Sequence, residues 1–242
     1  MSKFKDFLLN TEKQLNRAIF PKTVTCDVCN CDLFDERSLA VCDKCYEKLP
    51  FVLAPCEKCG KGTKDKCKLC QSVKHYFKQA RSVFEYVEPI TSLIHRFKYA
   101  HEFHLKSTFV HFMLMKYYSA DWNIDFVVCS PMNKNKEKLR IKNQAQELAN
   151  EFCEKTGLEN KSDILVKHIE QTQTKLNREQ RFANVKDSIE IVDKKCVKHK
   201  NILVIDDVMT TSATVNAIAK VLKDSGAKNV YVLTVATVSM ID

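Results

Sequence analysis

Residues 206–214 gather two carboxylates and a run of hydroxyl groups into one short stretch, DDVMTTSAT. It follows the apolar run NILVI and precedes a helical pattern, so it should lie between a strand and a helix N-terminus. Free backbone N–H groups and the helix dipole at that place favour a phosphate. Carboxylates beside a phosphate repel it unless they face other groups, and vicinal sugar hydroxyls are suitable donors to them. The stretch predicts a ribose phosphate site; the alternative is that Asp206 and Asp207 are solvated acids capping a helix.

Other phosphate and nucleophile motifs are missing from the sequence. The chain contains neither GxxxxGK[ST] nor GxGxxG, which gives no support to a P-loop nucleotidase or a dinucleotide-binding domain. It also shows no Ser/His/Asp or Cys/His arrangement for covalent catalysis. Any transferase chemistry would therefore depend on electrostatic stabilisation of a sugar cation and of the departing pyrophosphate.

Four CxxC pairs lie between residues 26 and 70. A CxxC turn points two thiolates at one tetrahedral ion, with zinc to sulfur distances of about 2.3 Å, so four pairs predict two structural zinc sites. The shortest loops join the first pair with the second and the third with the fourth, and Cys31 is a spare. The alternative is that these cysteines pack as small hydrophobic side chains. The predicted zinc ligands are Cys26, Cys29, Cys42, Cys45, Cys56, Cys59, Cys67 and Cys70.

The net charge of +9 favours polyanionic partners without choosing among nucleic acid, phosphorylated ligands and anionic lipid. A dense basic run suggests contacts with the phosphates of a single strand; the alternative is a solvated face. No stretch approaches the ~18 apolar residues of a membrane span, so we expect no membrane insertion and a cytoplasmic protein. The basic run consists of Lys134, Lys136, Lys138, Arg140 and Lys142.

Three segments are expected from composition and periodicity: an amphipathic docking helix over 1–22, a double zinc module over 23–74 and a larger domain over 75–242. In the larger domain, strand and helix patterns alternate, which predicts an α/β fold with an open, mostly parallel sheet. The strand patterns cover 80–87, read as an edge or antiparallel strand, 125–131, 163–169, 201–205 and 229–238. The helix patterns cover 90–99, 103–118, 144–156 and 214–225.

The stretch VIDDVMTTSAT resembles the phosphoribosyl pyrophosphate (PRPP) motif of type I phosphoribosyltransferases. The order of the CxxC pairs, LIHRFKY, SPMNKNKEKLRIKNQAQELA, TQTKLNREQRFANV and this motif is similar to the ComF family of ComFC-type competence proteins. The resemblance implies a zinc-binding N-terminus joined to a phosphoribosyltransferase-type domain. It also implies a cytoplasmic role on incoming single-stranded DNA during natural transformation, beside a helicase-like partner protein.

The resemblance also implies roles for individual residues. Asp206 and Asp207 would hold the ribose hydroxyls, and Mg²⁺ would bridge the pyrophosphate. The 5′-phosphate loop would comprise Val208, Met209, Thr210, Thr211, Ser212, Ala213 and Thr214. The pyrophosphate-side loop would comprise Ser130, Pro131 and Met132, and a mobile flap would carry Arg178, Arg181 and Asn184.

The sequence departs from the family pattern at four positions. Ser212 replaces a usual Gly, which costs roughly 1 kcal/mol of backbone strain if the position needs a positive φ. Ile141 and Lys142 replace a usual Gly-Phe, and Asn133 replaces a usual His. We expect an accessory protein of DNA uptake that binds single-stranded DNA and PRPP with Mg²⁺. The alternatives are an active phosphoribosyltransferase with an unidentified acceptor and a zinc adaptor without a ligand.

Overall fold

The structure is a computed structural model that describes residues 24–33, 39–63, 67–132, 142–167 and 189–238. The chain divides into two compact units, residues 1–48 and 49–242. In the first unit, β1 (Val24–Thr25) pairs antiparallel with β2 (Asp32–Leu33), and α2 (Asp43–Tyr46) follows. The expected helix over 1–22 lies outside the described residues.

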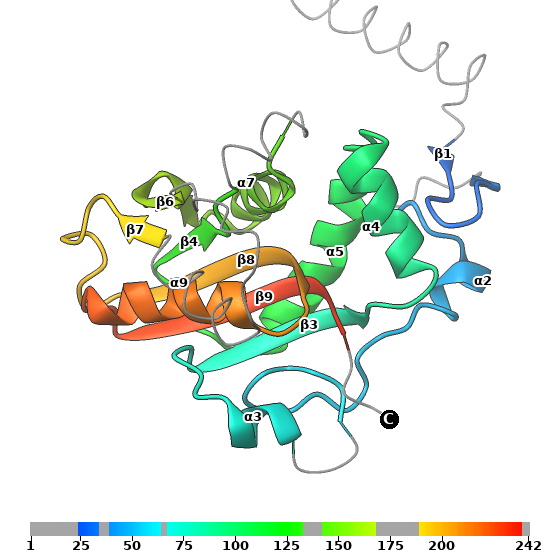
Figure 1. The fold of residues 1–242 in the computed structure, drawn as a ribbon. Helices are drawn as coiled ribbons and strands as arrows, with labels where there is room; N and C mark the ends of the chain where they lie inside the picture. Colours follow the sequence, from blue (N-terminus) through cyan, green and yellow to red (C-terminus); the bar gives the residue numbers. More distant parts are fainter. Residues whose placement is uncertain (1–23, 34–38, 64–66, 133–141, 168–188, 239–242) are drawn as a thin grey trace, which may run out of the picture. The chain divides into compact units, whose positions relative to one another are not determined.

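The second unit is built on a five-stranded sheet of the order β3-β9-β8-β4-β5 (Figure 1). Every pairing in this sheet is parallel, which confirms the predicted α/β class. The segment 80–87 was predicted as an edge or antiparallel strand. It lies at the edge of the sheet, and its pairing with β9 is parallel. The strands are β3 (Gln79–Glu85), β4 (Phe126–Cys129), β5 (Glu159–Asn160), β8 (Asn201–Met209) and β9 (Asn229–Thr237).

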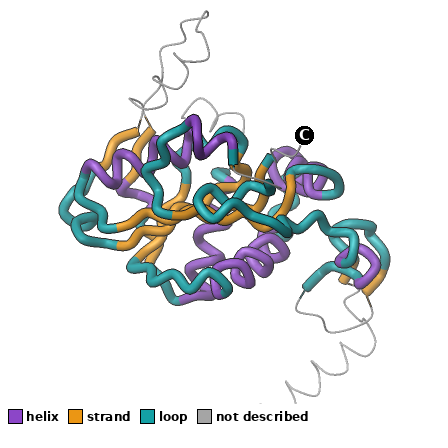
Figure 2. Tube along the Cα trace, turned by 90° about the horizontal axis from the view of Figure 1, so that it is seen from below, coloured by secondary structure: helices purple, strands orange, loops and turns teal. Residues whose placement is uncertain are grey.

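Helices lie on both faces of the sheet (Figures 1 and 2). On one face α5 contacts β3 and β9, α7 contacts β4 and β8, and α4 packs on α5. On the other face α9 contacts β8 and β9. Among the described residues no helix is long and apolar enough to cross a membrane. The helices are α3 (Lys68–Ser72), α4 (Ile90–Tyr99), α5 (Leu105–Tyr118), α7 (Gln144–Thr156) and α9 (Ala213–Asp224).

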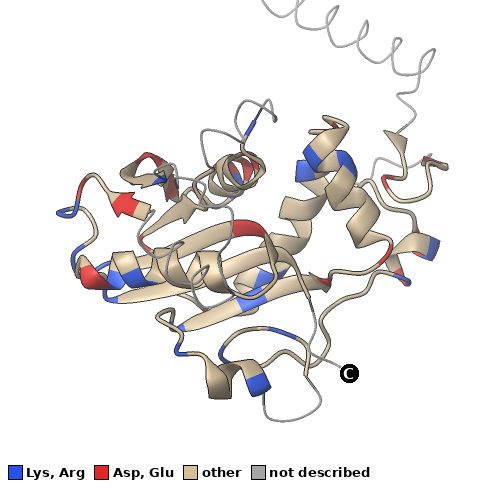
Figure 3. Ribbon diagram, viewed as in Figure 1, with Lys and Arg blue, Asp and Glu red and all other residues tan. Residues whose placement is uncertain are grey.

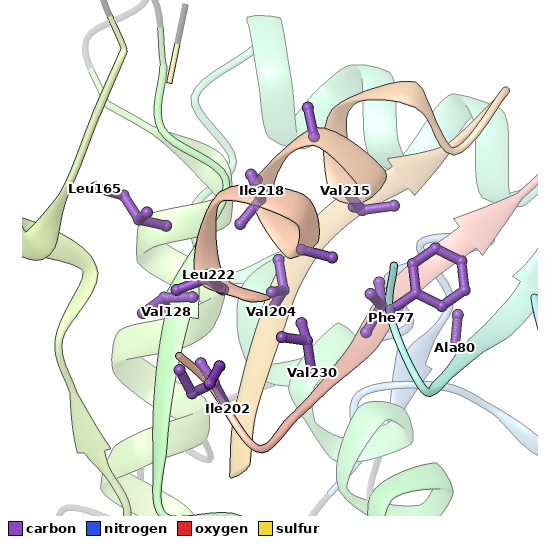
Figure 4. Packing of buried hydrophobic residues seen from close by; sticks show 14 of the residues in the cluster. Phe77, Ala80, Val128, Leu165, Ile202, Val204, Val215, Ile218, Leu222 and Val230 are labelled. Atoms are coloured by element: carbon purple, nitrogen blue, oxygen red, sulfur yellow. The ribbon is translucent and has the colours of Figure 1, made fainter. Parts of the chain in front are cut away.

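The core follows the two-residue period of buried strands. Alternate residues of β4, β8 and β9 point to the α9 side, where Val204, Val230 and Val128 meet Ile218 and Leu222 of the helix (Figure 4). The residues between them, such as Leu203, are also fully buried, because α5 and α7 cover the opposite face. This is why NILVI reads as a continuous apolar run.

The segment over 163–169 differs from its predicted role as a sheet strand. It forms a short 3-10 helix, η1 (Ser162–Ile164), and then β6 (Leu165–Lys167), which pairs antiparallel with β7 (Ile189–Ile191) outside the main sheet. The two residues of β5 take the edge position beside β4 instead. Ile164 and Leu165 pack in the α9 core, so the hydrophobic pattern is real although the pairing is different.

The second cysteine cluster lies in the larger unit, whereas we expected it within one module over 23–74. Gly60, at φ +70°, passes so close to β3 that a Cβ there would lie 2.5 Å from the carbonyl oxygen of Ala80. The N–H of Ala80 donates to the carbonyl of Lys58, and Cys59 and Cys67 join the core beneath α9. This close packing places the segment after Leu49 with the sheet.

Candidate functional site

The acidic pair lies inside β8 rather than at its tip. We predicted a strand end at Ile205, but pairing with β9 continues to Met209. Pairing with β4 stops at Ile205, opposite Cys129, so among the described residues β8 has no strand partner on that side beyond this point. Figure 3 shows the acidic colour on this part of β8. The open flank leaves Asp206 and Asp207 only half-buried, although the strand before them is fully buried.

Lys98, at the end of α4, neutralises one of the two acids. Its Nζ lies 2.8 Å from Oδ2 of Asp207, and the two side chains are 16% and 15% exposed. The buried Gln144 reaches the backbone of the same residue, because its amide lies 3.5 Å from the carbonyl oxygen of Lys98. The sequence prediction missed Lys98 as a site residue, although it stands in the LIHRFKY stretch.

Asp206 lacks such a partner among the ion pairs of the described residues. Burial raises the pKa of its carboxyl to about 7, and the negative charge of Asp207 adds to the rise. Near neutral pH the pair therefore carries a carboxyl that is ready to lose a proton when donors or a cation arrive. Sugar hydroxyls supply such donors, because hydrogen bonding to the charged form of a carboxyl favours that form.

The loop after β8 has the backbone of an anion site. Ser212 has φ 65° and ψ 2°, the left-handed conformation for which Gly is the usual residue, and it is the N-cap of α9. Its hydroxyl is buried without a hydrogen-bond partner among the described residues. The first N–H groups of a helix have no partner within the helix, and the first turn of α9 contains no acid. The N–H of Ala213 donates weakly to the hydroxyl of Thr211 at 3.4 Å, and the N–H groups that follow it in the first turn fit a phosphate group.

The predicted second loop lies directly beside the acids. Ser130 continues β4, and its N–H donates to the carbonyl of Ile205 at 3.0 Å. The side-chain amide of Asn143 donates to the carbonyl of Ser130 at 3.1 Å, while its Oδ1 caps α7. Ser130 is buried, and Pro131 and Met132 are half-buried. The structure thus places Ser130 beside the residue of β8 that precedes Asp206.

Several predicted residues lie outside the described part of the chain. These are the flap residues Arg178, Arg181 and Asn184, and the basic residues Lys134, Lys136, Lys138 and Arg140. Of the basic run, the structure describes Lys142. Its ammonium lies 3.3 Å from Glu147 and 5.0 Å from the ring centroid of Phe103, and 47% of its side chain is exposed.

The cysteines form two clusters, in each of which four Sγ atoms lie within 4.8 Å of one another. In a tetrahedral site with zinc to sulfur bonds of 2.3 Å, neighbouring sulfurs are about 3.8 Å apart. Cys56 and Cys70 are 3.8 Å apart, Cys59 and Cys67 3.5 Å. The second cluster has the predicted four ligands, so the third and fourth pairs come together. These residues fit a structural metal ion.

The first cluster contains one cysteine more than predicted. Cys31, which we expected to be a spare, lies with Cys26, Cys29 and Cys42. The thiol of Cys45 also interacts with Cys26, Cys29 and Cys42. Five thiols therefore lie close together, whereas a tetrahedral metal ion needs four ligands. The spacing CxxCxC over 26–31 is the sequence signal for this, because the turn that brings two thiols together also brings the third.

Known proteins resemble this chain in sequence and in fold. Competence protein ComFC of Streptococcus pneumoniae is 30% identical over 203 residues, which cover 78% of this chain and 82% of that protein. The chain belongs to the ComF family. Competence protein F of Haemophilus influenzae is 25% identical over 202 residues, covering 79% of this ComF chain and 86% of that protein. No family model matches the chain.

Solved structures that resemble the ComF chain include a PRPP amidotransferase and an adenine phosphoribosyltransferase. A glutamine PRPP amidotransferase from B. subtilis gives a TM-score of 0.37 at 20% identity, over 52% of this chain and 25% of that one. Adenine phosphoribosyltransferase from Leishmania tarentolae gives 0.35 at 13% identity, over 72% and 89%. This chain thus spans about a quarter of the amidotransferase. Such low scores carry no argument about ligands.

The ComF chain also has a polar cavity of about 590 Å³ away from the acids. It lies among α7, the segment 159–164 and the segment 192–196, and it includes Gln146 and Asn150. The side-chain oxygen of Asn150 accepts from the amides of Gln146 and Asn160 at 2.8 and 2.7 Å. None of the predicted ligand-binding residues lines it. No local sequence signal marks this cavity, because its lining residues come from three separate segments.

Proposed function

We propose that this ComF chain binds PRPP as its Mg²⁺ complex and single-stranded DNA, as a cytoplasmic accessory protein of DNA uptake. The observation that carries the proposal is the juxtaposition at the end of β8. Asp206 and Asp207 lie on the open flank of the strand, and the strained Ser212 begins α9 a few residues later. The names of the relatives, both competence proteins, support the biological setting.

Each part of this site fits one part of PRPP. The two carboxylates accept hydrogen bonds from the ribose hydroxyls. The loop 208–214 offers backbone N–H groups and hydroxyls to the 5′-phosphate, with the buried Ser212 hydroxyl as one unpaired donor. Ser130 lies beside Ile205 at the acids, and the loop that it begins with Pro131 and Met132 would hold the pyrophosphate and its Mg²⁺. When bound, Mg²⁺ supplies charge neutralisation for the pyrophosphate oxygens.

The clusters of cysteines fit zinc as structural ions, because their all-thiolate ligands leave no open position for a substrate. Single-stranded DNA would be bound through its phosphates by the basic run over 134–142. A helicase-like competence protein is the expected protein partner. The cysteine clusters support the proposal of zinc. The basic run and the family support the proposal of DNA, and the family alone supports that of the protein partner.

Isothermal titration calorimetry with PRPP and Mg²⁺ tests the ligand. We expect binding by the wild type and a loss of at least tenfold in affinity for Asp206→Asn/Asp207→Asn, because two acceptors of the ribose hydroxyls are weakened together. Asp224→Asn, at the opposite end of α9 and paired with Lys220, is the control and should bind as the wild type does. Equal affinity of the double variant and the wild type would exclude this site.

Fluorescence anisotropy with a labelled oligonucleotide tests DNA binding. If the basic run contacts phosphates, the affinity should fall steeply with salt, and Lys→Ala changes over 134–142 should reduce the slope by about one per lost contact. Release of pyrophosphate from PRPP during incubation with candidate acceptors would instead identify a phosphoribosyltransferase. Binding of neither PRPP nor DNA would favour the alternative of a zinc adaptor without a ligand.

A further inference from the structure

Lys61 is a charged side chain in the interior of the protein. It follows Cys59 by two residues in the second cysteine cluster, and 1% of its surface is exposed. Lysine is almost never fully buried unless its ammonium is paired, because taking the charge out of water costs several kcal/mol. The position therefore calls for partners that compensate the ammonium.

Those partners are two backbone carbonyls at the edge of the proposed phosphate site. The Nζ of Lys61 donates to the carbonyl of Thr210, inside the loop 208–214, and to that of Val238 at 2.7 Å, just after β9. The same two strand ends are joined by the hydroxyl of Thr237, which donates to the carbonyl of Met209 at 2.9 Å. Lys61 thus links the end of β8 and the end of β9 from the cysteine cluster.

The contact fixes the orientation of one peptide unit in the loop. In a trans peptide the C=O and the following N–H point in opposite directions. Because the carbonyl of Thr210 is directed at Lys61, the N–H of Thr211 is directed away from it. Thr210 and Thr211 are exposed, so the side of the loop opposite to Lys61 is open to a ligand. A donor that points there is available to an anion.

The cysteine cluster holds the backbone of Lys61 in place. The N–H of Cys56 donates to the carbonyl of Lys61 at 2.8 Å, and residues 55 and 62 form a β-bridge. Gly60 is pressed against β3. The lysine therefore projects from a segment that is fixed at both its cysteine turn and the sheet.

We propose that Lys61 is a positioning residue for the anion loop, and that the second cysteine cluster serves the site by presenting this lysine. The proposal rests on the assignment of 208–214 as the phosphate loop. Lys61 orients the Thr210–Thr211 peptide and adds a buried positive charge behind the loop. A side chain that only filled space would do neither.

Hydrogen exchange measured by mass spectrometry on the unliganded protein tests the positioning without any ligand. Lys61→Met keeps the length and apolar stem but removes the ammonium, and we expect amides over 208–214 to exchange at least tenfold faster. Exchange over 201–205 should stay unchanged, which a general loss of stability would not allow. Lys58→Met is the matched control, because Lys58 lies in the same turn but donates to the carbonyl of Lys78. Loop exchange equal to that of the wild type would overturn the proposal.

Calorimetry with Mg²⁺ and PRPP on the same variants separates this proposal from the proposed function. We expect Lys61→Met to bind at least tenfold more weakly than Lys58→Met. If the wild type fails to bind PRPP, the assigned ligand is wrong, and the exchange result still decides the role of Lys61. If Lys61→Met does not fold by circular dichroism, Lys61→Gln, which retains an N–H donor, replaces it in both experiments. The Gln side chain is shorter and uncharged, so exchange raised over 208–214 but not over 201–205 supports the proposal; exchange equal to that of the wild type, or raised equally over both stretches, refutes it.

Discussion

Replacing Asp206 by Asn should stabilise the unliganded protein at neutral and alkaline pH. Burial and the neighbouring Asp207 raise the pKa of Asp206 from 3.8 to about 7. The folded protein therefore binds more protons than the unfolded chain between pH 4 and 7, so the free energy of unfolding falls as the pH rises through this range. The amide cannot ionise, so the variant escapes this loss.

The size of the effect follows from the shift. One pKa unit corresponds to about 1.36 kcal/mol, so three units correspond to roughly 4 kcal/mol when the carboxyl is fully ionised. Because Asp206 is only half-buried, solvent reduces the penalty, and we expect the variant to gain about 2 kcal/mol or more at pH 8. At pH 4 wild type and variant should be equally stable.

Urea unfolding between pH 4 and 8 measures this difference. The single tryptophan, Trp122, is 8% exposed and lies 5.1 Å from Tyr231 by ring centroids, so its fluorescence reports on the larger unit. Asp125→Asn is a control of opposite sign, because the N–H of Asn201 and the ammonium of Lys200 lower the pKa of Asp125. That carboxylate stabilises the fold above its unfolded pKa, so its loss should destabilise the protein at neutral pH. A variant Asp206→Asn that shows the pH dependence of the wild type would refute the reasoning.

Three further predictions test the geometry through urea unfolding. Ser212→Gly should stabilise the protein by up to about 1 kcal/mol, because relief of the left-handed strain exceeds the added chain entropy, and a clear loss would contradict strain there. Gly60→Ala should lower the free energy of unfolding by about 2 kcal/mol or more, because its Cβ would meet the backbone of β3. Gly157→Ala, also at positive φ but with open space, should lower it by about 1 kcal/mol. Equal losses would contradict the close approach. A double-mutant cycle of Lys98→Met and Asp207→Asn should give a coupling of about 1 kcal/mol, and a coupling of zero would deny the ion pair.

The sequence predicts the parts of this fold whose signals are local. The pattern of 90–99 coincides with α4, and Gly157 ends α7 in the left-handed conformation. The predicted strand at 163–169 was not in the main sheet, since an apolar run reports burial but not the pairing partner. Long-range partners have no local signal, and the structure alone shows that β4 stops pairing at Ile205.

The candidate site also contains residues with a local sequence signal and residues without one. The acids and the hydroxyl loop could be found from residue types beside a predicted strand end, whereas Ser130 and the strain at Ser212 were expected from the family resemblance. Lys98 and Lys61 could not be recognised, because each is joined to the site by a contact that spans a long stretch of chain. Among the 39 Lys and Arg residues of a basic protein, nothing in the sequence marks these two.

One strand carries both the centre of the core and the acidic pair. Residues 202–205 of β8 are completely buried, and residues 206–208 are half-buried on the open flank. A saturation mutagenesis survey along β8 should therefore change in phenotype between Ile205 and Asp206. Before that boundary, variants would be lost from the cell through misfolding; at residues 206–208 they would accumulate normally and lose the proposed ligand binding.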